Sequence, residues 1–374
     1  MTSTPGPRAL RPSGRLLPED TRRHHRALLL QLLFQYGPAS RADLARSSGL
    51  TRVTVSDVVG ILVAEGLLTE SAAPVQGRVG KPPVLVQLAE GARQIVAVDL
   101  SADGVVSGAL LNLSGAVQVR RSRPLQGRRG QEAVDLLHGL VGELLDLATR
   151  PVLGIGVGTP GVVDAAGVVL DAPNLGWHGT TLAEGLRTAF DVPVFVANDA
   201  NTAVLAEHTF GDAGEGGGLM LVRVGTGVGA GLVLEGVLLR GHRSAAGEVG
   251  HVVIDPEGAE CACGRRGCLE TVLAAPRLRE RLAADGPEAL AEVGTQVGVA
   301  LAPVVGTLNL HELVLSGPLD LLDGPLLAAV DRTIRERAMP VSGEELVVRT
   351  SALGDDVVLV GAAVLVLAGQ LGVS

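Results

Sequence analysis

The fold of this chain is most constrained by short apolar strands that end in glycine turns and alternate with helical segments. Strand patterns recur in "IVAVDLSADGVVSGALLNLSGAV", "VLGIGVGTPGVV", "VPVFVANDAN", "GLMLVRVGTGVGAGLVL" and "ELVLSGPL", and helical stretches such as "QEAVDLLHGLVGELLDLA" lie between them. With 51 glycines and only 2% aromatic residues, the core must be aliphatic and the turns rich in glycine. The sequence therefore predicts an α/β protein with a doubly wound or repeated architecture.

The beginning of the chain differs in charge from the remainder. Residues 1–89 contain 11 Lys or Arg against 6 Asp or Glu, whereas the whole chain carries a net charge of −9. This asymmetry predicts a small basic module attached to a large acidic one, the alternative being a solvated basic tail. We expect a disordered tail in residues 1–20, the basic module in 21–88 and the acidic module in 94–374.

The distribution of apolar residues bears on where the protein works. Residues 1–20 contain no apolar run, which argues against a secretory signal. The longest purely apolar stretch, from Val357 to Gly369, is shorter than the roughly 20 residues that a membrane span needs. We therefore expect this stretch to be a buried helix, and the protein to be cytoplasmic with no membrane partner.

The basic module has the pattern of a helix-turn-helix. One helix is expected in "HRALLLQLLFQYG" from His24, a second in "SRADLARSSG" up to Gly49, and a third that is capped by Thr51. A tight glycine turn between the second and third helices is typical of this DNA-binding motif. The expected apolar stripes are Leu28, Leu29, Leu32 and Leu33 on the first helix and Val55, Val58, Val59 and Leu62 on the third.

Polar residues of the third helix and of the following hairpin are the candidate DNA contacts. Arg52, Thr54 and Ser56 lie near the start of the third helix, where a recognition helix meets base edges. Arg78 and Lys81 lie on a Gly/Pro-rich hairpin tip, which predicts a wing that reaches phosphates or a minor groove. Three helices with a hairpin also occur in protein-docking modules, but basic charge at both places favours DNA.

All three cysteines lie within eight positions, close to a histidine. His251, Cys261, Cys263 and Cys268 have the spacing H-x9-C-x-C-x4-C. Three thiolates and an imidazole complete a tetrahedral zinc shell, which would be structural because no coordination position is left open. A disulfide with one spare thiol is the alternative, and a cytoplasmic location opposes it.

Two glutamates flank this predicted metal site. Glu248 precedes His251 by three residues, and Glu270 follows Cys268 by two. A metal cross-link would hold both carboxylates where they accept hydrogen bonds from the hydroxyls of a polyol. His251 could bind the metal through one ring nitrogen and face a ligand with the other. The alternative is that both glutamates are solvated or only support the metal ligands.

Two further strand ends carry candidate catalytic groups. Asn198 and Asp199 directly follow the apolar strand "VFVA". Asp199 is a candidate general base for phosphoryl transfer to an alcohol, with a helix cap as the alternative. The glycine-rich turn that includes Gly225, Thr226 and Gly227 offers backbone amides to a phosphate, although such turns are just as often structural.

Taken together, these motifs resemble one family. "GEVGH" with "CACGRRGCLE" resembles the signature of the ROK family of repressors, open reading frames and kinases, and "GIGVGTPGVVD", "APNLGW", "NDAN" and "GTGVGAG" match its other blocks in order. The likeness runs from about residue 94 to the C-terminus. Residues 21–88 look like the winged helix-turn-helix of the family's transcription factors, with the wing as "GRVGKP".

The resemblance implies both a fold and a set of ligand contacts. The expected fold is the two-lobed actin-like ATPase (ribonuclease H-like) fold, preceded by a winged helix-turn-helix domain, with a sugar between the lobes. Asp199 matches the base of the family's kinases. The residues that match the family's sugar contacts are Asn198, Asp199, Glu248, His251 and Glu270.

One block departs from the kinases of the family. Their first phosphate turn is of the Asp-x-Gly-Gly-Thr type, whereas this chain has Asp99, Leu100, Ser101, Ala102 and Asp103. The Cβ atoms of Ser101 and Ala102 obstruct the approach of the backbone to the phosphates, and the carboxylate of Asp103 repels them. At an effective dielectric near 20, a like-charge contact at about 4 Å costs roughly 4 kcal/mol. ATP and Mg²⁺ are therefore not expected cofactors.

The sequence thus predicts a transcriptional regulator, most plainly a repressor, whose operator affinity is controlled by a sugar or amino sugar. Two DNA-reading heads imply a homodimer or homotetramer on a palindromic operator. Two alternatives stay open. One is an ATP-dependent sugar kinase with an attached DNA-binding head, and the other is a regulator that answers to a phosphotransferase protein.

Overall fold

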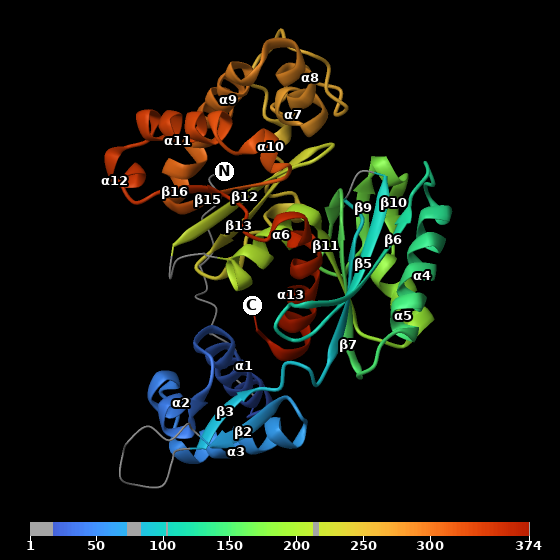
Figure 1. Cartoon of the computed structure of the whole chain (residues 1–374), viewed down its shortest axis with the longest axis vertical. Helices are drawn as coiled ribbons and strands as arrows, with labels where there is room; N and C mark the ends of the chain where they lie inside the picture. Colours follow the sequence, from blue (N-terminus) through green and yellow to red (C-terminus); the bar gives the residue numbers. More distant parts are fainter. Residues whose placement is uncertain (1–17, 73–83, 102–103, 212–216, 374) are drawn as a thin grey trace, which may run out of the picture. The chain divides into compact units, whose positions relative to one another are not determined.

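The chain forms two compact units, which are described separately. The computed structural model describes residues 18–72, 84–101, 104–211 and 217–373. One unit comprises Met1–Leu88 and the other Ala89–Ser374 (Figure 1).

The first unit consists of three helices and a small antiparallel sheet, an order typical of winged helix-turn-helix domains. The capping box of Ser40 and Asp43 starts α2, and the hydroxyl of Thr51 caps α3 by accepting from Thr54 N. The axes of α2 and α3 meet at 117°, within the range of helix-turn-helix motifs. The elements are α1 (Pro18–Tyr36), β1 (Ala39–Ser40), α2 (Arg41–Ser48), α3 (Arg52–Ala64), β2 (Leu68–Ala72) and β3 (Val84–Leu88), with strand order β1-β3-β2.

The core of this unit matches the expected stripes on α3 but not on α1. Val55, Val58, Val59 and Leu62 are all buried, as the helical periodicity predicts. On α1 the buried side chains are Leu29, Leu30 and Leu33, whereas Leu28 and Leu32 are only partly buried. The predicted stripe was therefore rotated, because five leucines among the six residues 28–33 leave the buried face undetermined by sequence alone. Helix α1 also begins at Pro18, before the expected start at His24, so it includes the end of the predicted tail.

The second unit contains two five-stranded sheets with the same topology. In each sheet, three strands that are consecutive in the sequence pair in antiparallel fashion. Two later strands extend the sheet next to the first of these three, and they run parallel to it. The first sheet has the order β11-β7-β4-β5-β6, and the second has the order β14-β13-β12-β15-β16. The two sheets thus repeat the same order of strand connections, although the sequence shows no tandem repeat.

Each sheet organises its own hydrophobic core, and these two halves are here called the first and second lobes. The first lobe contains β4 (Gln94–Asp99), β5 (Val105–Leu111), β6 (Val117–Pro124), α4 (Gln131–Asp146), β7 (Val152–Thr159), α5 (Leu182–Phe190) and β11 (Val194–Asn198). A small antiparallel sheet is added to it by β8 (Val162–Val163), β9 (Val169–Ala172) and β10 (Trp177–Thr180), with the short helix η1 (Pro173–Leu175).

The second lobe carries more helices than the first. Its elements are β12 (Gly218–Val224), β13 (Val228–Leu234), β14 (Val237–Leu238), η2 (His242–Ser244), η3 (Val249–His251), α7 (Glu270–Leu273), α8 (Ala275–Asp285), α9 (Pro287–Leu308), β15 (Leu310–Ser316), α10 (Leu319–Leu322), α11 (Pro325–Arg337), α12 (Pro340–Gly343), β16 (Val347–Thr350) and η4 (Gly354–Asp356).

Two helices lie between the sheets and join the lobes. Helix α6 (Asp199–Phe210) follows the last strand of the first sheet but packs against β12 and β13 of the second. Helix α13 (Val357–Leu371) follows the last strand of the second sheet but packs against β4, β7 and β11 of the first (Figure 1). The two helices also pack against each other. Each lobe is therefore covered by a helix that the other lobe supplies.

Two helices of the described residues are apolar enough to cross a membrane by length and composition, namely Pro287–Leu308 and Gly354–Leu371. Both owe this composition to packing. All residues of α13 from Val357 to Leu367 are buried, which confirms the expected buried helix. On α9 the buried residues recur every three to four positions and the helix packs on α11.

A glycine sets the distance between α6 and α13. A Cβ atom on Gly361 would lie 1.9 Å from the carbonyl oxygen of Thr202. We expect Gly361→Ala to force the helices apart and lower the free energy of unfolding by about 3 kcal/mol, measured by urea denaturation. Gly139→Ala in α4, where nothing lies within 4 Å, is the matched control and should stabilise the protein by about 0.5–1 kcal/mol. Equal midpoints for the two variants would refute the close contact.

Candidate functional site

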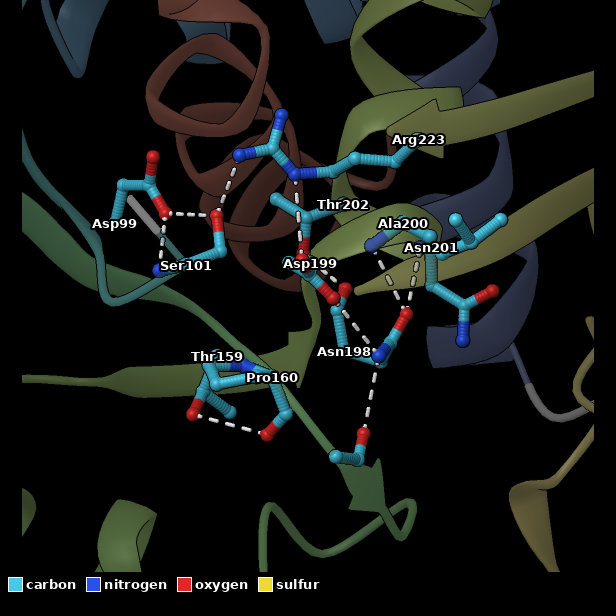
Figure 2. A network of polar contacts seen from close by, with 12 residues as sticks. Asp99, Ser101, Thr159, Pro160, Asn198, Asp199, Ala200, Asn201, Thr202 and Arg223 are labelled. Atoms are coloured by element: carbon cyan, nitrogen blue, oxygen red, sulfur yellow. Dashed lines mark hydrogen bonds and ion pairs between the residues drawn. The ribbon is translucent and has the colours of Figure 1, made fainter. Parts of the chain in front are cut away.

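Asn198 and Asp199 lie where β11 ends and α6 begins. The side-chain oxygen of Asn198 accepts hydrogen bonds from the backbone N–H groups of Ala200 (2.9 Å) and Asn201 (3.1 Å), so Asn198 is the helix cap. The alternative role of Asp199 as the cap was therefore wrong. Its carboxylate instead accepts from Asn198 Nδ2 through Oδ1 (3.0 Å) and from Arg223 Nε through Oδ2 (3.2 Å) (Figure 2).

Glu248 is placed by a loop that lies directly on β13. Gly247 has φ +94°, and a Cβ atom there would lie 1.8 Å from the carbonyl oxygen of Ala230. In the other direction, Ala230 N donates to Gly247 O at 2.8 Å. Because only glycine permits this approach, the "GEVG" pattern fixes Glu248 at the strand.

Two acidic side chains in this region, Glu248 and Asp199, have pKa values that their surroundings raise. Burial raises the pKa of Glu248, His251 opposes this shift, and the charges of Asp199 and Glu270 raise the pKa further. Burial also raises the pKa of Asp199, the Arg223 guanidinium opposes this, and Asp99 adds to the increase. His251, Asp199 and Glu270, which the sequence predicted to contact a sugar together with Glu248, are thus charges near this side chain. Such a group of carboxylates suits the hydroxyl groups of a polyol.

The four predicted metal ligands form one cluster. His251 Nδ1 lies 3.5 Å from Cys261 Sγ, and Cys263 Sγ lies 3.6 Å from Cys268 Sγ. All four ligand atoms lie within 4.8 Å of one another. A tetrahedral Zn²⁺ with Zn–S bonds of about 2.3 Å places its sulfurs about 3.8 Å apart, so the donors fit a structural zinc ion. All three cysteines are free, so the structure favours the metal site over the disulfide alternative.

The three thiols of the cluster differ in how readily they lose a proton, which a metal ligand must do. Burial raises the pKa of Cys261 to about 12 and also raises that of Cys268. The backbone N–H of Arg265 lowers the pKa of Cys263, which is exposed. His251 presents its other nitrogen, Nε2, 4.0 Å from Glu248 Oε2. The ring therefore faces the cysteines on one side and the acidic residues on the other.

Glu270 connects this cluster to the glycine-rich turn. Its Oε2 accepts from Val228 N at 2.9 Å, and its Oε1 lies 3.7 Å from Cys261 Sγ. Both carboxylate oxygens thus have partners within the protein. A contact between Glu270 and a sugar remains a prediction, alongside the alternative that this residue supports the cluster.

The glycine-rich turn borders a cavity of about 370 Å³. Gly225 and Thr226 lie in its wall, and Gly227 closes the turn by accepting from Gly225 N at 2.9 Å. None of the five predicted sugar residues lines this cavity. Its lining is Asp99, Ser101, Ser107, Arg120, Arg223, Val224, Gly225, Thr226, Ala275, Arg279, Gly317, Pro318, Gly354, Asp355 and Leu359.

Arg223 is a functional candidate that the sequence reasoning missed. Its guanidinium lies between Asp199 and Ser101, and Ser101 in turn donates to Asp99 (Figure 2). A charged residue inside the apolar strand "GLMLVRV" was the available signal. Two residues of the altered phosphate turn, Ala102 and Asp103, lie outside the described residues.

The predicted DNA contacts on α3 differ in their freedom to reach a base. Arg52 and Ser56 are exposed, whereas Thr54 is half-buried and its hydroxyl is bonded to that of Thr51 at 2.9 Å. Val53, which the sequence reasoning passed over, is 71% exposed between them, where a methyl group can contact thymine. The wing residues Arg78 and Lys81 lie outside the described residues.

The two sheets share one topology, and each is covered by the helix that comes after the last strand of the other sheet. This arrangement is the two-lobed actin-like ATPase fold. Within this class of proteins, the chain belongs to the ROK family, which it matches over residues 95–368. The family expected from the motifs is thereby confirmed.

Two curated relatives that resemble the chain over most of its length are named as a repressor and as a transcriptional regulator. The xylose repressor of Bacillus subtilis (strain 168) is 26% identical over 91% of this chain and 94% of its own. The DNA-binding transcriptional dual regulator NagC of Escherichia coli (strain K12) is 28% identical over 87% of this chain and 88% of its own.

Solved structures agree in fold. A ROK family transcriptional regulator, described as a homolog of the E. coli MLC protein, has a TM-score of 0.81 at 27% identity and covers 94% of this chain and 97% of its own. The ROK hexokinase of Thermus thermophilus has a TM-score of 0.61 at 28% identity, and it covers 97% of its own chain but 73% of this one.

Proposed function

We propose that the protein is a DNA-binding transcriptional repressor whose operator affinity is controlled by a sugar or amino sugar. The observation that carries this proposal is the extent of the similarity. The structural match to a transcriptional regulator covers 94% of the chain, whereas the match to a hexokinase covers 73%. Relatives that are named xylose repressor and N-acetylglucosamine repressor resemble this chain over both of its units.

In this proposal residues 21–88, within the first unit, form a winged helix-turn-helix that reads DNA. Arg52 and Ser56 at the exposed start of α3 contact base edges, with Thr54 closer to the helix cap. Arg78 and Lys81 contact phosphates or a minor groove. A homodimer or homotetramer presents two such heads to a palindromic operator in the cytoplasm.

The sugar is held in the second unit, residues 94–374, by Asn198, Asp199, Glu248, His251 and Glu270. Support comes from the shared electrostatics of their carboxylates. His251, Cys261, Cys263 and Cys268 hold a structural Zn²⁺ that keeps His251 and Glu270 in place, and the donor set and its spacing support this ion. By binding one arrangement of the lobes more tightly, the sugar changes the separation of the DNA-reading heads.

The alternative of a sugar kinase is favoured less. In a kinase Asp199 would be the catalytic base, and Gly225, Thr226 and Gly227 would bind phosphate. Here one oxygen of Asp199 is already an acceptor for Arg223, which also lines the cavity beside the glycine turn. A general base must be within hydrogen-bond reach of the proton that it takes, and this oxygen already has a donor within the protein. A regulator that answers to a phosphotransferase protein would need no sugar at all.

The function is tested by selecting duplexes from a random DNA pool with the full chain, then titrating the selected duplex by fluorescence anisotropy. We expect a palindromic sequence, and its release by one member of a panel containing xylose, glucose and N-acetylglucosamine. Arg52→Ala should weaken operator binding by about 1–3 kcal/mol, measured in the same titration. Arg332→Ala, at an exposed position of α11, is the control. Failure to select any duplex would refute the proposal.

Kinase activity is tested with a coupled ATP assay on the same sugars. We expect no sugar-dependent turnover above background from the wild type, because Arg223 occupies the carboxylate of the only proposed base. Turnover that disappears in Asp199→Asn would establish the kinase alternative. Turnover that persists in this variant would instead indicate a contaminating enzyme.

A further inference from the structure

Arg223 is a charged residue within the apolar strand β12. Its neighbours on β12, Val222 and Val224, are 0% and 1% exposed, and its own side chain is 15% exposed. A guanidinium is costly to bury unless its donors are satisfied. Arg223 meets this requirement with two different nitrogens, because Nε donates to Asp199 (3.2 Å) and Nη2 donates to Ser101 Oγ (2.7 Å).

These two contacts connect the lobes. Arg223 belongs to the second sheet, whereas Ser101 follows β4 of the first. Ser101 is itself fixed, since its N and Oγ both donate to Asp99 Oδ1, at 2.7 and 2.5 Å. Asp199 begins α6 directly after β11 of the first sheet. The guanidinium therefore spans from one lobe to the other at the ends of β4 and β11 (Figure 2).

The same contacts orient the carboxylate of Asp199. Its Oδ2 is held by Arg223, while its Oδ1 accepts from the neighbouring Asn198. When the lobes move apart, Arg223 moves with the second sheet and loses Ser101 of the first, so the guanidinium that holds Oδ2 keeps only one of its two partners. A ligand that needs this orientation then binds better to the closed arrangement.

We propose that Arg223 is a positioning residue that couples the sugar site to the lobes, holding Asp199 ready for a sugar hydroxyl only while it also reaches Ser101. The inference rests on the proposed sugar-responsive function. It does not require Arg223 to touch the sugar. Ser101 contacts Arg223 but has no bond to Asp199 among the described hydrogen bonds. The proposal nevertheless requires that Ser101 affect sugar affinity, and this consequence distinguishes it.

The test is calorimetric titration of the full chain with xylose, glucose and N-acetylglucosamine. Arg223→Met should weaken binding of the sugar that the wild type recognises by about tenfold or more, as expected for a lost hydrogen bond to a charged group. Arg223→Lys should restore part of this loss, because an ammonium reaches one partner but lacks the fork that serves two. Arg332→Met in α11 is the matched control and should bind as the wild type does.

Ser101→Ala separates coupling from local support. We expect it to weaken sugar binding several-fold on its own and to add nothing in the double variant with Arg223→Met, because both changes break one connection. Hydrogen exchange of the backbone around Ser101 should slow on sugar binding in the wild type but not in Arg223→Met. Thermal melts of each variant show whether it is folded.

The outcomes distinguish the two ideas. If no sugar binds the wild type, the proposed function fails and this inference fails with it. If a sugar binds but Ser101→Ala leaves its affinity unchanged, or the two substitutions are additive, only the coupling is overturned.

Discussion

Replacement of Arg349 by Met is expected to lower the free energy of unfolding by about 3–5 kcal/mol. Arg349 on β16 donates to Glu207 Oε2 at 2.9 Å and to the carboxylate of Glu312 on β15. These glutamates are 0% and 4% exposed. Burial acts to lower the pKa of Arg349, but hydrogen bonds to Glu312 and Glu207 outweigh it and raise the pKa. Without the guanidinium, two carboxylates are left in the core with no positive charge between them.

The position of this triad makes its effect large. Glu207 belongs to α6, the helix that comes from the first lobe and covers the sheet of the second. Ser351 also donates to Glu207, so the helix is held by one residue of β16 and by the residue that directly follows it. Loss of Arg349 should therefore loosen the contact between the lobes as well as the second lobe itself.

Urea denaturation followed by circular dichroism measures the change. Arg277→Met is the matched control, since its pair with Glu280 is 58% and 64% exposed and should contribute less than about 1 kcal/mol. The triple variant Arg349→Met, Glu207→Gln, Glu312→Gln should regain much of the lost stability, because it removes the uncompensated charges. If Arg349→Met and Arg277→Met had equal midpoints, the buried triad would not be a source of stability.

The architecture was largely accessible from sequence because it depends on local patterns. Apolar strands that end in glycine turns predicted the α/β class, and the motif blocks predicted the family. The periodicity of Val55, Val58, Val59 and Leu62 gave the buried face of α3. The shared topology of the two sheets was not accessible, because it lies in the order of strand connections and leaves no repeat in the residues.

The site was predicted where the chain is locally continuous and missed where it is not. His251 and the three cysteines lie within 18 residues of one another, and their spacing predicted the cluster. Arg223 is 122 residues from Ser101, so nothing local could pair them. The choice between Asn198 and Asp199 as helix cap also escaped the sequence, because both side chains suit that role and differ by one position.

Replacement of Cys268 by Ser is expected to remove stoichiometric zinc and with it sugar recognition. Cys268 is 0% exposed, and residues 252–269 form no helix or regular strand, only turns and the isolated bridges Val253–Cys268 and Glu260–Arg266. A metal that binds only the folded segment contributes its binding energy to folding. We therefore expect the melting temperature to fall by about 10 °C, and a chelator to produce the same fall in the wild type.

The loss of sugar recognition follows from what the cluster holds. His251 faces Cys261 through Nδ1 and Glu248 through Nε2, and Glu270 begins α7 two residues after Cys268. Release of the segment would separate these groups from Asp199 on α6. Because several hydrogen bonds to the ligand are lost together, calorimetry should show sugar affinity reduced by at least about a hundredfold.

Thr271→Val is the matched control for this prediction. Its hydroxyl donates to the carbonyl of Cys268 at 2.7 Å, so the substitution perturbs the same segment while leaving all four metal ligands in place. We expect it to retain one zinc per chain by elemental analysis and to bind sugar within a few-fold of the wild type. A Cys268→Ser protein that lacks zinc yet binds sugar normally would show that the acidic residues are positioned without the metal, and that the cluster serves another part of the second lobe.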